Sequence, residues 1–315
     1  MTETPSGARV AVTGATGFVG QAVVKNLADQ GYRVIGISQP KSPPPNLEGL
    51  LDAYFSIDLR EKCPDFGSID GLIHLAGLSS VGASFSRPQD YIATNSQIVT
   101  NLFESALAHR WEGRAILVSS GALYGAVTVP LAGFSEDSPV LSTSPYVISK
   151  ILIEKQAEYY GLRGVDVIVA RPFNHIGPGQ KPGFIVPDLV QKVVGSLPGH
   201  PVTAGNLNSS RDYTDVRDVA EAYRLLLECA SPVHKIYNVC SGLSRSGREI
   251  LNAICKALNI HVPDVVEADS RAIDPSTVIG NGERIRHQVG WEPIIDFQTS
   301  INDFVECYLQ GQHSL

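Results

Sequence analysis

Three glycines, each three residues from the next, follow the first apolar stretch of the chain. Arg9–Thr13 has the composition of a short buried strand, Gly14, Gly17 and Gly20 come directly after it, and an amphipathic helical pattern starts among them. A second apolar strand follows at Arg33–Ile37. The chain therefore makes a tight turn between a strand and a helix, which predicts a parallel βαβ unit.

The same alternation continues through the first half of the chain. Further strands and helices are expected at Ala53–Ile57, Gly71–Leu75, Pro88–His109, Ala115–Ser119, Tyr146–Tyr160 and Val165–Ala170. Continuous Val/Ile/Leu strands indicate a parallel sheet covered by helices on both faces. After Arg171 the rhythm loosens, with helices expected at Ile185–Gly195, Val216–Glu228, Arg248–Leu258 and Phe297–Tyr308. We expect an α/β fold: a Rossmann-type doubly wound sheet over 1–170, and a smaller, mainly substrate-binding lobe over 171–315 with some segments returning to the sheet.

The glycine turn predicts a dinucleotide site, because a helix N-terminus and close backbone favour a pyrophosphate. Its expected contacts are Gly14, Thr16, Gly17, Phe18, Val19 and Gly20. An NAD site usually has an acid after the second strand, but here the chain reads Ser38-Gln39-Pro40-Lys41. Without a carboxylate to repel a 2′-phosphate, and with Ser38 or Lys41 as donors, we expect NADP in preference to NAD. Asp58 is placed to reach the adenine, unless it merely caps its strand.

A proton-transfer pair follows in the sequence. Tyr146 and Lys150 stand four residues apart on one helical face, where the cation is expected to lower the pKa of the phenol. Ser120 ends the fifth strand, and the carboxyl ends of parallel strands are where such sheets place their chemistry. A serine there can polarise the oxygen that the tyrosine protonates.

In their order and spacing, these motifs resemble the extended short-chain dehydrogenase/reductase family over nearly the whole chain. The shared motifs are the glycine turn, His74-Leu-Ala-Gly77, Ser119-Ser120 with Tyr124-Gly125, Tyr146-x-x-x-Lys150 and Arg171-Pro-Phe-Asn174. The resemblance implies a catalytic triad of Ser120, Tyr146 and Lys150, with Lys150 also holding the nicotinamide ribose. It also implies cofactor contacts from Ser38, Asp58, Leu59, Leu75, Ala76, Gly77, Asn95, Tyr146, Lys150 and Pro172, with Asn95 more structural than catalytic.

Within the family, residues after the triad serine separate the reactions. Sugar-nucleotide 4,6-dehydratases commonly carry an acid there, whereas this chain has Gly121 and Ala122, which cannot move a proton. C3/C5 epimerase-reductases use an extra cysteine and histidine, and no cysteine is close to Ser120 in the sequence. Two later segments, Arg171–Gln180 and Gly205–Asp218, look most like the GDP-4-keto-6-deoxy-D-mannose reductases.

That resemblance implies a substrate site that binds a nucleotide-diphosphate sugar. Asn174 and Arg211 would contact its diphosphate and sugar, with Ser120 and Tyr146 at the reacting carbonyl. A surface ion pair with Asp212 or Asp215 is the alternative for Arg211. Weaker candidates are Arg271, for phosphate or ribose, and Val186 and Lys192, beside the nucleotide. Since those reductases tend to carry acids at the positions of Gly121 and Ala122, a different keto-sugar or nucleotide stays open.

The expected reaction is NAD(P)H-dependent reduction of an NDP-4-keto-6-deoxyhexose, best of all GDP-4-keto-6-deoxy-D-mannose to GDP-D-rhamnose. A UDP-sugar 4-epimerase with tightly bound NAD is the main alternative, and a 4,6-dehydratase is weaker. A non-catalytic NADP sensor is a further alternative, although it would have no need of Ser120, Tyr146 and Lys150 together.

Bulk properties limit the partners. A net charge of −7 offers no basic surface for nucleic acid or an anionic membrane, and neither a signal peptide nor an 18-residue apolar run is present. Five scattered cysteines predict reduced core thiols in a cytoplasmic protein, and no metal site. Relatives pair two helices with those of a second subunit, so we expect a homodimer through a four-helix bundle. The outward residues of Pro88–His109 and Tyr146–Tyr160 would be Ile98, Leu102, Phe103, Ile151 and Leu152, although a sheet-facing core explains them too.

Overall fold

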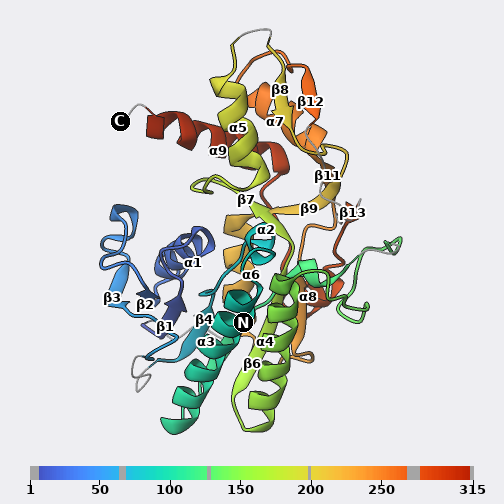
Figure 1. Cartoon of the computed structure of the whole chain (residues 1–315). Coiled ribbons are helices and arrows are strands. Elements are labelled where there is room, and N and C mark those ends of the chain that lie inside the picture. The colour runs from blue at the N-terminus through green and yellow to red at the C-terminus, as the bar shows by residue number, and fades with distance from the viewer. Residues whose placement is uncertain (1–6, 64–68, 126–128, 198–199, 268–276, 313–315) are drawn as a thin grey trace.

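A sheet of seven parallel strands forms the centre of the computed structural model, which describes residues 7–63, 69–125, 129–197, 200–267 and 277–312 (Figure 1). From one edge to the other its strands are β10 (Ile236–Val239), β6 (Asp166–Pro172), β5 (Arg114–Val118), β4 (Gly71–His74), β1 (Arg9–Thr13), β2 (Arg33–Ser38) and β3 (Leu51–Ser56). The order reverses direction at β1, so the sheet is doubly wound, as predicted.

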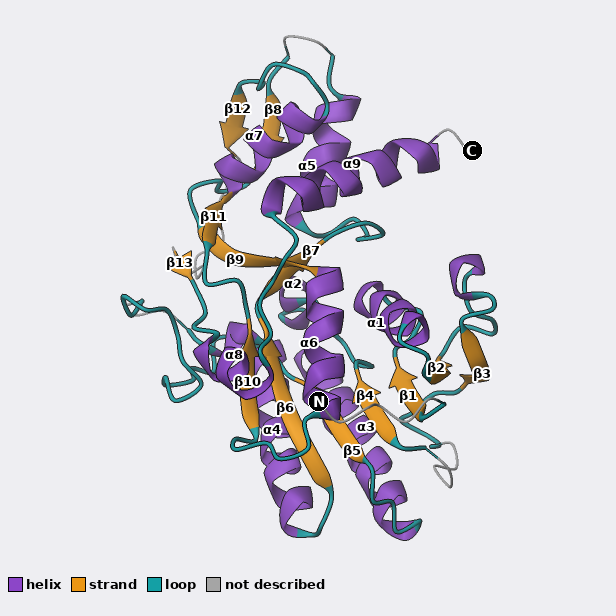
Figure 2. Cartoon of the chain, turned by 180° about the vertical axis from the view of Figure 1, so that it is seen from behind, coloured by secondary structure: helices purple, strands orange, loops and turns teal. Residues whose placement is uncertain are grey.

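Helices cover both faces of this sheet. α3 (Pro88–Ala108) and α4 (Pro145–Leu162) pack side by side on one face, with the short α2 (Val81–Ser84) beside them, while α1 (Phe18–Asp29) and α6 (Val216–Glu228) cover the other (Figure 2). Successive residues of the strands point to opposite faces and, except in the edge strand β3, are largely buried on both. This explains why the strands have continuous apolar sequences.

The second lobe has its own apolar core. It contains α5 (Ile185–Gly195), α7 (Gly247–Ala257) and α9 (Phe297–Gln312), with β8 (Val202–Ala204) paired to β12 (Val265–Glu267). Between the lobes lies a small sheet of β7 (Asn174–Ile176), β9 (Ser210–Asp215), β11 (Ser244–Ser246) and β13 (Thr277–Val278). α6, β10 and α8 (Glu283–Val289) come after residue 171 but pack with the large sheet.

One packing expectation is wrong. Ile98, Leu102 and Phe103 of α3 are not outward-facing: they are at most 5% exposed, in the core between α3, α4 and the sheet. On α4, Leu152 does reach the surface, whereas Ile151 is only partly exposed and packs against the cluster around Tyr146. A helical pattern alone does not show which of two apolar stripes faces the sheet.

Candidate active site

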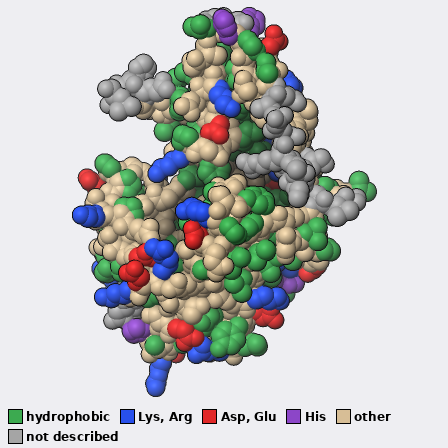
Figure 3. Space-filling view, viewed as in Figure 1, with side chains coloured by type: hydrophobic (Ala, Val, Ile, Leu, Met, Phe, Trp, Pro, Cys, Tyr) green, Lys and Arg blue, Asp and Glu red, His purple; other side chains and the backbone are tan. Residues whose placement is uncertain are grey.

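A cavity of about 1320 Å³ lies between the carboxyl ends of the main strands and the small lobe, where the space-filling view is hollowed (Figure 3). It brings together most of the predicted site, from segments spread over two hundred residues. The predicted residues that line it are Gly14, Thr16, Gly17, Phe18, Val19, Gly20, Ser38, Asp58, Leu59, Leu75, Ala76, Gly77, Ser120, Tyr146, Lys150, Pro172, Asn174, Lys192 and Arg211.

The glycine turn forms the phosphate end of the cavity. Gly14 has φ +71°, and a Cβ on Gly20 would lie 2.1 Å from the Gly14 carbonyl oxygen, so neither position accepts a side chain. α1 begins after Gly17 without a side-chain cap. Its first N–H groups therefore remain available to an anion, which fits a dinucleotide pyrophosphate.

The ends of β2 and β3 form the neighbouring wall of the cavity, where the adenosine is expected. Ser38 is buried and its Oγ accepts a hydrogen bond from the Thr16 N–H at 3.2 Å, while Lys41 is exposed and is not among the lining residues. Asp58 pairs with Arg60, Nη2 to Oδ2 at 2.5 Å, and this contact lowers the pKa of the carboxyl to about 2. Arg60 also lines the cavity. Asp58 was predicted as a site residue, whereas Arg60, two residues further along the chain, was not.

Ser120, Tyr146 and Lys150 meet at the ends of β5 and α4. The Ser120 hydroxyl is close enough to the Tyr146 phenol to act on its pKa, and it accepts a hydrogen bond from the Ala122 N–H at 3.1 Å. Lys150 Nζ donates to the Val118 carbonyl at 2.8 Å and lies 5.8 Å from the centre of the Tyr146 ring. α4 starts just before the tyrosine because Ser144 caps it, its side chain accepting from Val147 N.

The sequence predicted a lowered pKa for Tyr146, and this prediction is wrong for the protein without ligand. Burial raises the pKa of Tyr146, and the neighbouring Ser120 hydroxyl only partly opposes it. Burial also lowers the pKa of Lys150, to about 8, so the neighbouring cation is itself weakened. For both groups the effect of burial outweighs the neighbours that oppose it, Ser120 for the tyrosine and Glu154 for the lysine. Tyr146 consequently keeps its proton at neutral pH, as a proton donor must.

Two predicted contacts, Asn95 and Val186, are not among the residues that line the cavity. Asn95 is behind the cavity wall, where its amide bonds the Leu78 N–H (2.8 Å), the Leu78 carbonyl (3.1 Å) and Ser149 Oγ (2.9 Å). It joins the loop after β4 to the helix of the triad. Val186 belongs to the core of the small lobe, because its position on α5 faces inward. Arg271 lies outside the described residues.

The small lobe and the sheet beside it form the other end of the cavity, where the substrate is expected. Asn174, Lys192 and Arg211 line it. The two carboxylates suggested as partners of Arg211 are engaged elsewhere: Asp212 accepts from Ser241 and from the N–H groups of residues 242 and 280, and Asp215 pairs with residue 217. Further lining residues that were not predicted include His175, Gln180, Lys181, Asp188 and Tyr223.

The turn after Ser120 is packed against aromatic rings. A Cβ on Gly121 would lie 2.7 Å from the Phe173 ring, which stacks on Tyr124 with centroids 5.7 Å apart. Beneath them Arg171, 5% exposed, donates to Tyr124 Oη at 2.7 Å and forms a two-pronged ion pair with Glu154 of α4. This buried network joins the serine turn to the helix of Tyr146 and Lys150.

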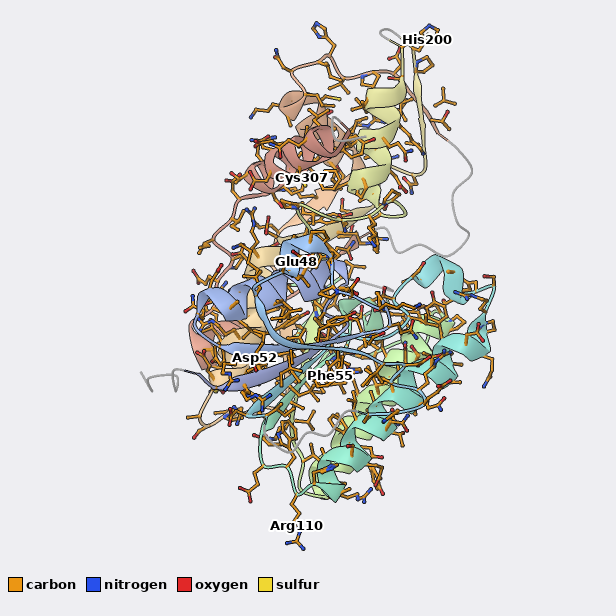
Figure 4. All side chains as sticks on the ribbon, turned by 90° about the vertical axis from the view of Figure 1, so that its left-hand side faces the viewer. Glu48, Asp52, Phe55, Arg110, His200 and Cys307 are labelled. Atoms are coloured by element: carbon orange, nitrogen blue, oxygen red, sulfur yellow. The ribbon has the colours of Figure 1, made fainter. Side chains whose placement is uncertain are left out.

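The cysteine expectation is only partly right. Cys240 and Cys255 are buried, Cys63 and Cys229 are half-buried, and Cys307 is exposed on the small lobe (Figure 4). Within the described ranges, no group of three or more His, Cys, Asp or Glu side chains is suited to a metal ion. In the same part of the chain, no helix is long and apolar enough to cross a membrane.

Comparison with known proteins places the chain among nucleotide-sugar enzymes. Residues 10–240 match the model of the "NAD dependent epimerase/dehydratase family". GDP-6-deoxy-D-mannose reductase from Pseudomonas aeruginosa is 31% identical over 93% of this chain and 94% of its own length, and a UDP-glucose 4-epimerase from Lacticaseibacillus casei is 30% identical over 91% and 92%. The structure of RMD from P. aeruginosa complexed with NADPH superposes with a TM-score of 0.82, at 28% identity, covering 96% of this chain and 99% of that one.

The family match spans most of the chain, and the cavity brings together the glycine turn, Ser120, Tyr146 and Lys150. The chain therefore belongs to the NAD dependent epimerase/dehydratase family, the extended short-chain dehydrogenases, and is an NAD(P)-dependent sugar-nucleotide enzyme.

Proposed function

We propose that this enzyme reduces the 4-keto group of GDP-4-keto-6-deoxy-D-mannose with NADPH, giving GDP-D-rhamnose. The observation that carries the proposal is the end of β2, which has Ser38 and Gln39 where an NAD site usually has a carboxylate, with Arg60 on the same cavity wall. A 2′-phosphate meets no acid at the end of β2 itself, and the carboxylate of the nearby Asp58 is paired with Arg60. An exchangeable NADPH suits a net reduction, whereas an epimerase retains its NAD and regenerates it.

Each site residue has a separate role in the proposed reaction. A dinucleotide held by the glycine turn and Lys150 would supply the hydride for C4 of the sugar. Tyr146 donates its proton to the carbonyl oxygen, and Ser120 hydrogen-bonds the same oxygen as negative charge develops on it. Lys150 holds the nicotinamide ribose. Asn174 and Arg211, with Lys192 nearby, hold the diphosphate and so orient the sugar over the nicotinamide.

A UDP-sugar 4-epimerase is the second candidate, favoured by the 30% identity to the L. casei enzyme. It needs the same triad and no further acid. A 4,6-dehydratase is disfavoured, because elimination requires a second acid–base group and the turn after Ser120 has only Gly121 and Ala122.

The decisive experiment mixes the purified enzyme with NADPH and chemoenzymatically prepared GDP-4-keto-6-deoxy-D-mannose and follows the loss of absorbance of the reduced cofactor. We expect rapid oxidation that disappears in Tyr146→Phe, with GDP-D-rhamnose as the product. No oxidation, together with NAD released on denaturation and interconversion of UDP-glucose and UDP-galactose, would establish the epimerase instead.

The active form is proposed to be a homodimer that pairs α3 and α4 with those of a second copy. Ile148, Leu152 and Tyr159 form an exposed stripe along α4, each at least 37% exposed, and Phe85 lies exposed just after α2, which contacts α4. Hydrophobic side chains gather over this region in Figure 3. A stripe of this kind suits burial against a partner helix.

A further inference from the structure

One buried hydroxyl on the cavity wall has no partner. Tyr223 of α6 is fully buried, and its Oη makes no hydrogen bond with any described residue. It nevertheless lines the active-site cavity. A buried hydroxyl without a partner is costly to the fold, so one that faces a binding cavity suggests a ligand group that completes it.

The phenol is aimed at the reacting end of the cavity. α6 begins at Val216, beside the small sheet at the cleft, and runs down the face of the large sheet (Figure 2). Because helical side chains lean towards the N-terminus of their helix, the ring of Tyr223 leans towards the cleft. It belongs to the same core cluster as Leu75 and Val118, which line the cavity at the ends of β4 and β5. It is also close enough to Tyr146 for a charge on that phenol to raise its pKa.

We propose that the Tyr223 hydroxyl hydrogen-bonds the carboxamide of the nicotinamide ring and is a positioning residue for it. The inference rests on the placement of the nicotinamide at Ser120, Tyr146 and Lys150 in the proposed function. With its ribose held by Lys150, the ring would lie near Leu75 and Val118, which line the cavity at the ends of β4 and β5. The carboxamide is the polar group of that ring, with both donors and an acceptor, and a phenol can pair with either.

The test compares two phenols of the same core. Tyr223→Phe removes an unpaired hydroxyl, whereas the matched control Tyr237→Phe removes one that donates to Gln288 Oε1 (3.0 Å) and accepts from the His234 N–H (3.1 Å). Each variant is melted without ligand. Affinities are then measured by calorimetry for NADPH and NADH, and for their fragments lacking nicotinamide, 2′-phospho-ADP-ribose and ADP-ribose.

For Tyr223→Phe we expect an unchanged or higher melting temperature, about tenfold weaker binding of the dinucleotide that the wild type prefers, and unchanged binding of its fragment. Tyr237→Phe should have a lower melting temperature than the wild type, and it should bind the dinucleotide and its fragment as the wild type does. Two outcomes would overturn the proposal: equal affinity of Tyr223→Phe and wild type for the dinucleotide, as expected if only water occupies the site, or a lower melting temperature of Tyr223→Phe without ligand. No sugar substrate is used, so the result is independent of whether the enzyme is a reductase or an epimerase.

Discussion

The ring of Phe173 occupies the space into which a side chain at position 121 would project, 2.7 Å from the ideal Cβ. Gly121 is thus required by packing within the turn that follows Ser120, and an acid at this position would displace the aromatic stack. Ala122 is partly exposed to the cavity, so packing does not exclude an acid at this position; the chain simply has alanine there.

Gly121→Ala should therefore destabilise the protein, by about 1–3 kcal/mol, because a methyl group is forced against a buried ring. Ala122→Ser adds an atom to the neighbouring, partly exposed position and should change the free energy of unfolding far less. Urea denaturation of both variants checks this. Equal stability of Gly121→Ala and the wild type would show that Phe173 moves aside freely.

The ion pair of Arg171 with Glu154 is buried, the two side chains being 6% and 10% exposed. Arg171→Met leaves the carboxylate uncompensated and should cost about 3–5 kcal/mol, whereas Arg171→Met combined with Glu154→Met should recover much of this loss. Urea denaturation of the two single variants and the double variant measures the coupling. If the double variant loses as much stability as the two single variants together, the packing of the arginine, rather than its charge, stabilises this region.

Cofactor preference should be reversed by restoring an acid after β2. Gln39 is exposed and lines the cavity, so Gln39→Asp places a carboxylate where a 2′-phosphate is expected. We expect kcat/KM for NADPH to fall at least tenfold and the ratio of NADH to NADPH use to rise. Lys41→Gln changes the net charge of the same loop by the same amount, outside the cavity, and should leave the ratio unchanged. If kcat/KM for NADPH falls equally in both variants, the cause is the overall charge of the loop and not a carboxylate beside the 2′-phosphate.

The sequence predicted the large sheet and the main helices well because they are long and strongly periodic. α5 and α6 have their predicted bounds, and β1 does too. β10 was not identified: Ile236–Val239 is short, and its Asn238 is fully buried and bonded to Tyr124 and to backbone carbonyls of residues 134 and 281. Such a polar residue is stable in a core only because of partners distant in sequence, which spacing cannot reveal.

The candidate site, like the fold, could be predicted from the sequence only in part. Residues on strand ends and in the glycine turn could be placed from the sequence, because topology brings strand ends together. Arg60 had a usable signal, two residues beyond Asp58 at the end of β3. Tyr223 had none, since a tyrosine on the buried face of a helix is usually a core residue. Whether the pKa of Tyr146 is raised or lowered depends on its burial, and the four-residue spacing from Lys150 does not show how buried it is.

The proposed dimer should depend on α4. Leu152→Glu puts a charge in the centre of the exposed stripe and should convert a dimer into a monomer, measured by light scattering after size exclusion. Ile260→Glu puts the same charge at an exposed residue of the small lobe, just after α7 and away from α4, and serves as the control. A wild-type monomer, or a dimer in Leu152→Glu, would exclude this interface.

The rate of reduction should fall at alkaline pH through Lys150. Its pKa is lowered to about 8 by burial, so the cation is complete below that pH and is lost as pH rises through it, whereas the raised pKa of Tyr146 keeps the proton donor loaded. We expect kcat/KM for the keto-sugar to be level from pH 6 to about 7 and to decline above about 8. Lys150→Arg keeps a charge at every pH, so its residual activity should lack this decline. If the variant declines like the wild type, another group sets the alkaline limb, and Lys150 would be assigned to ribose binding alone.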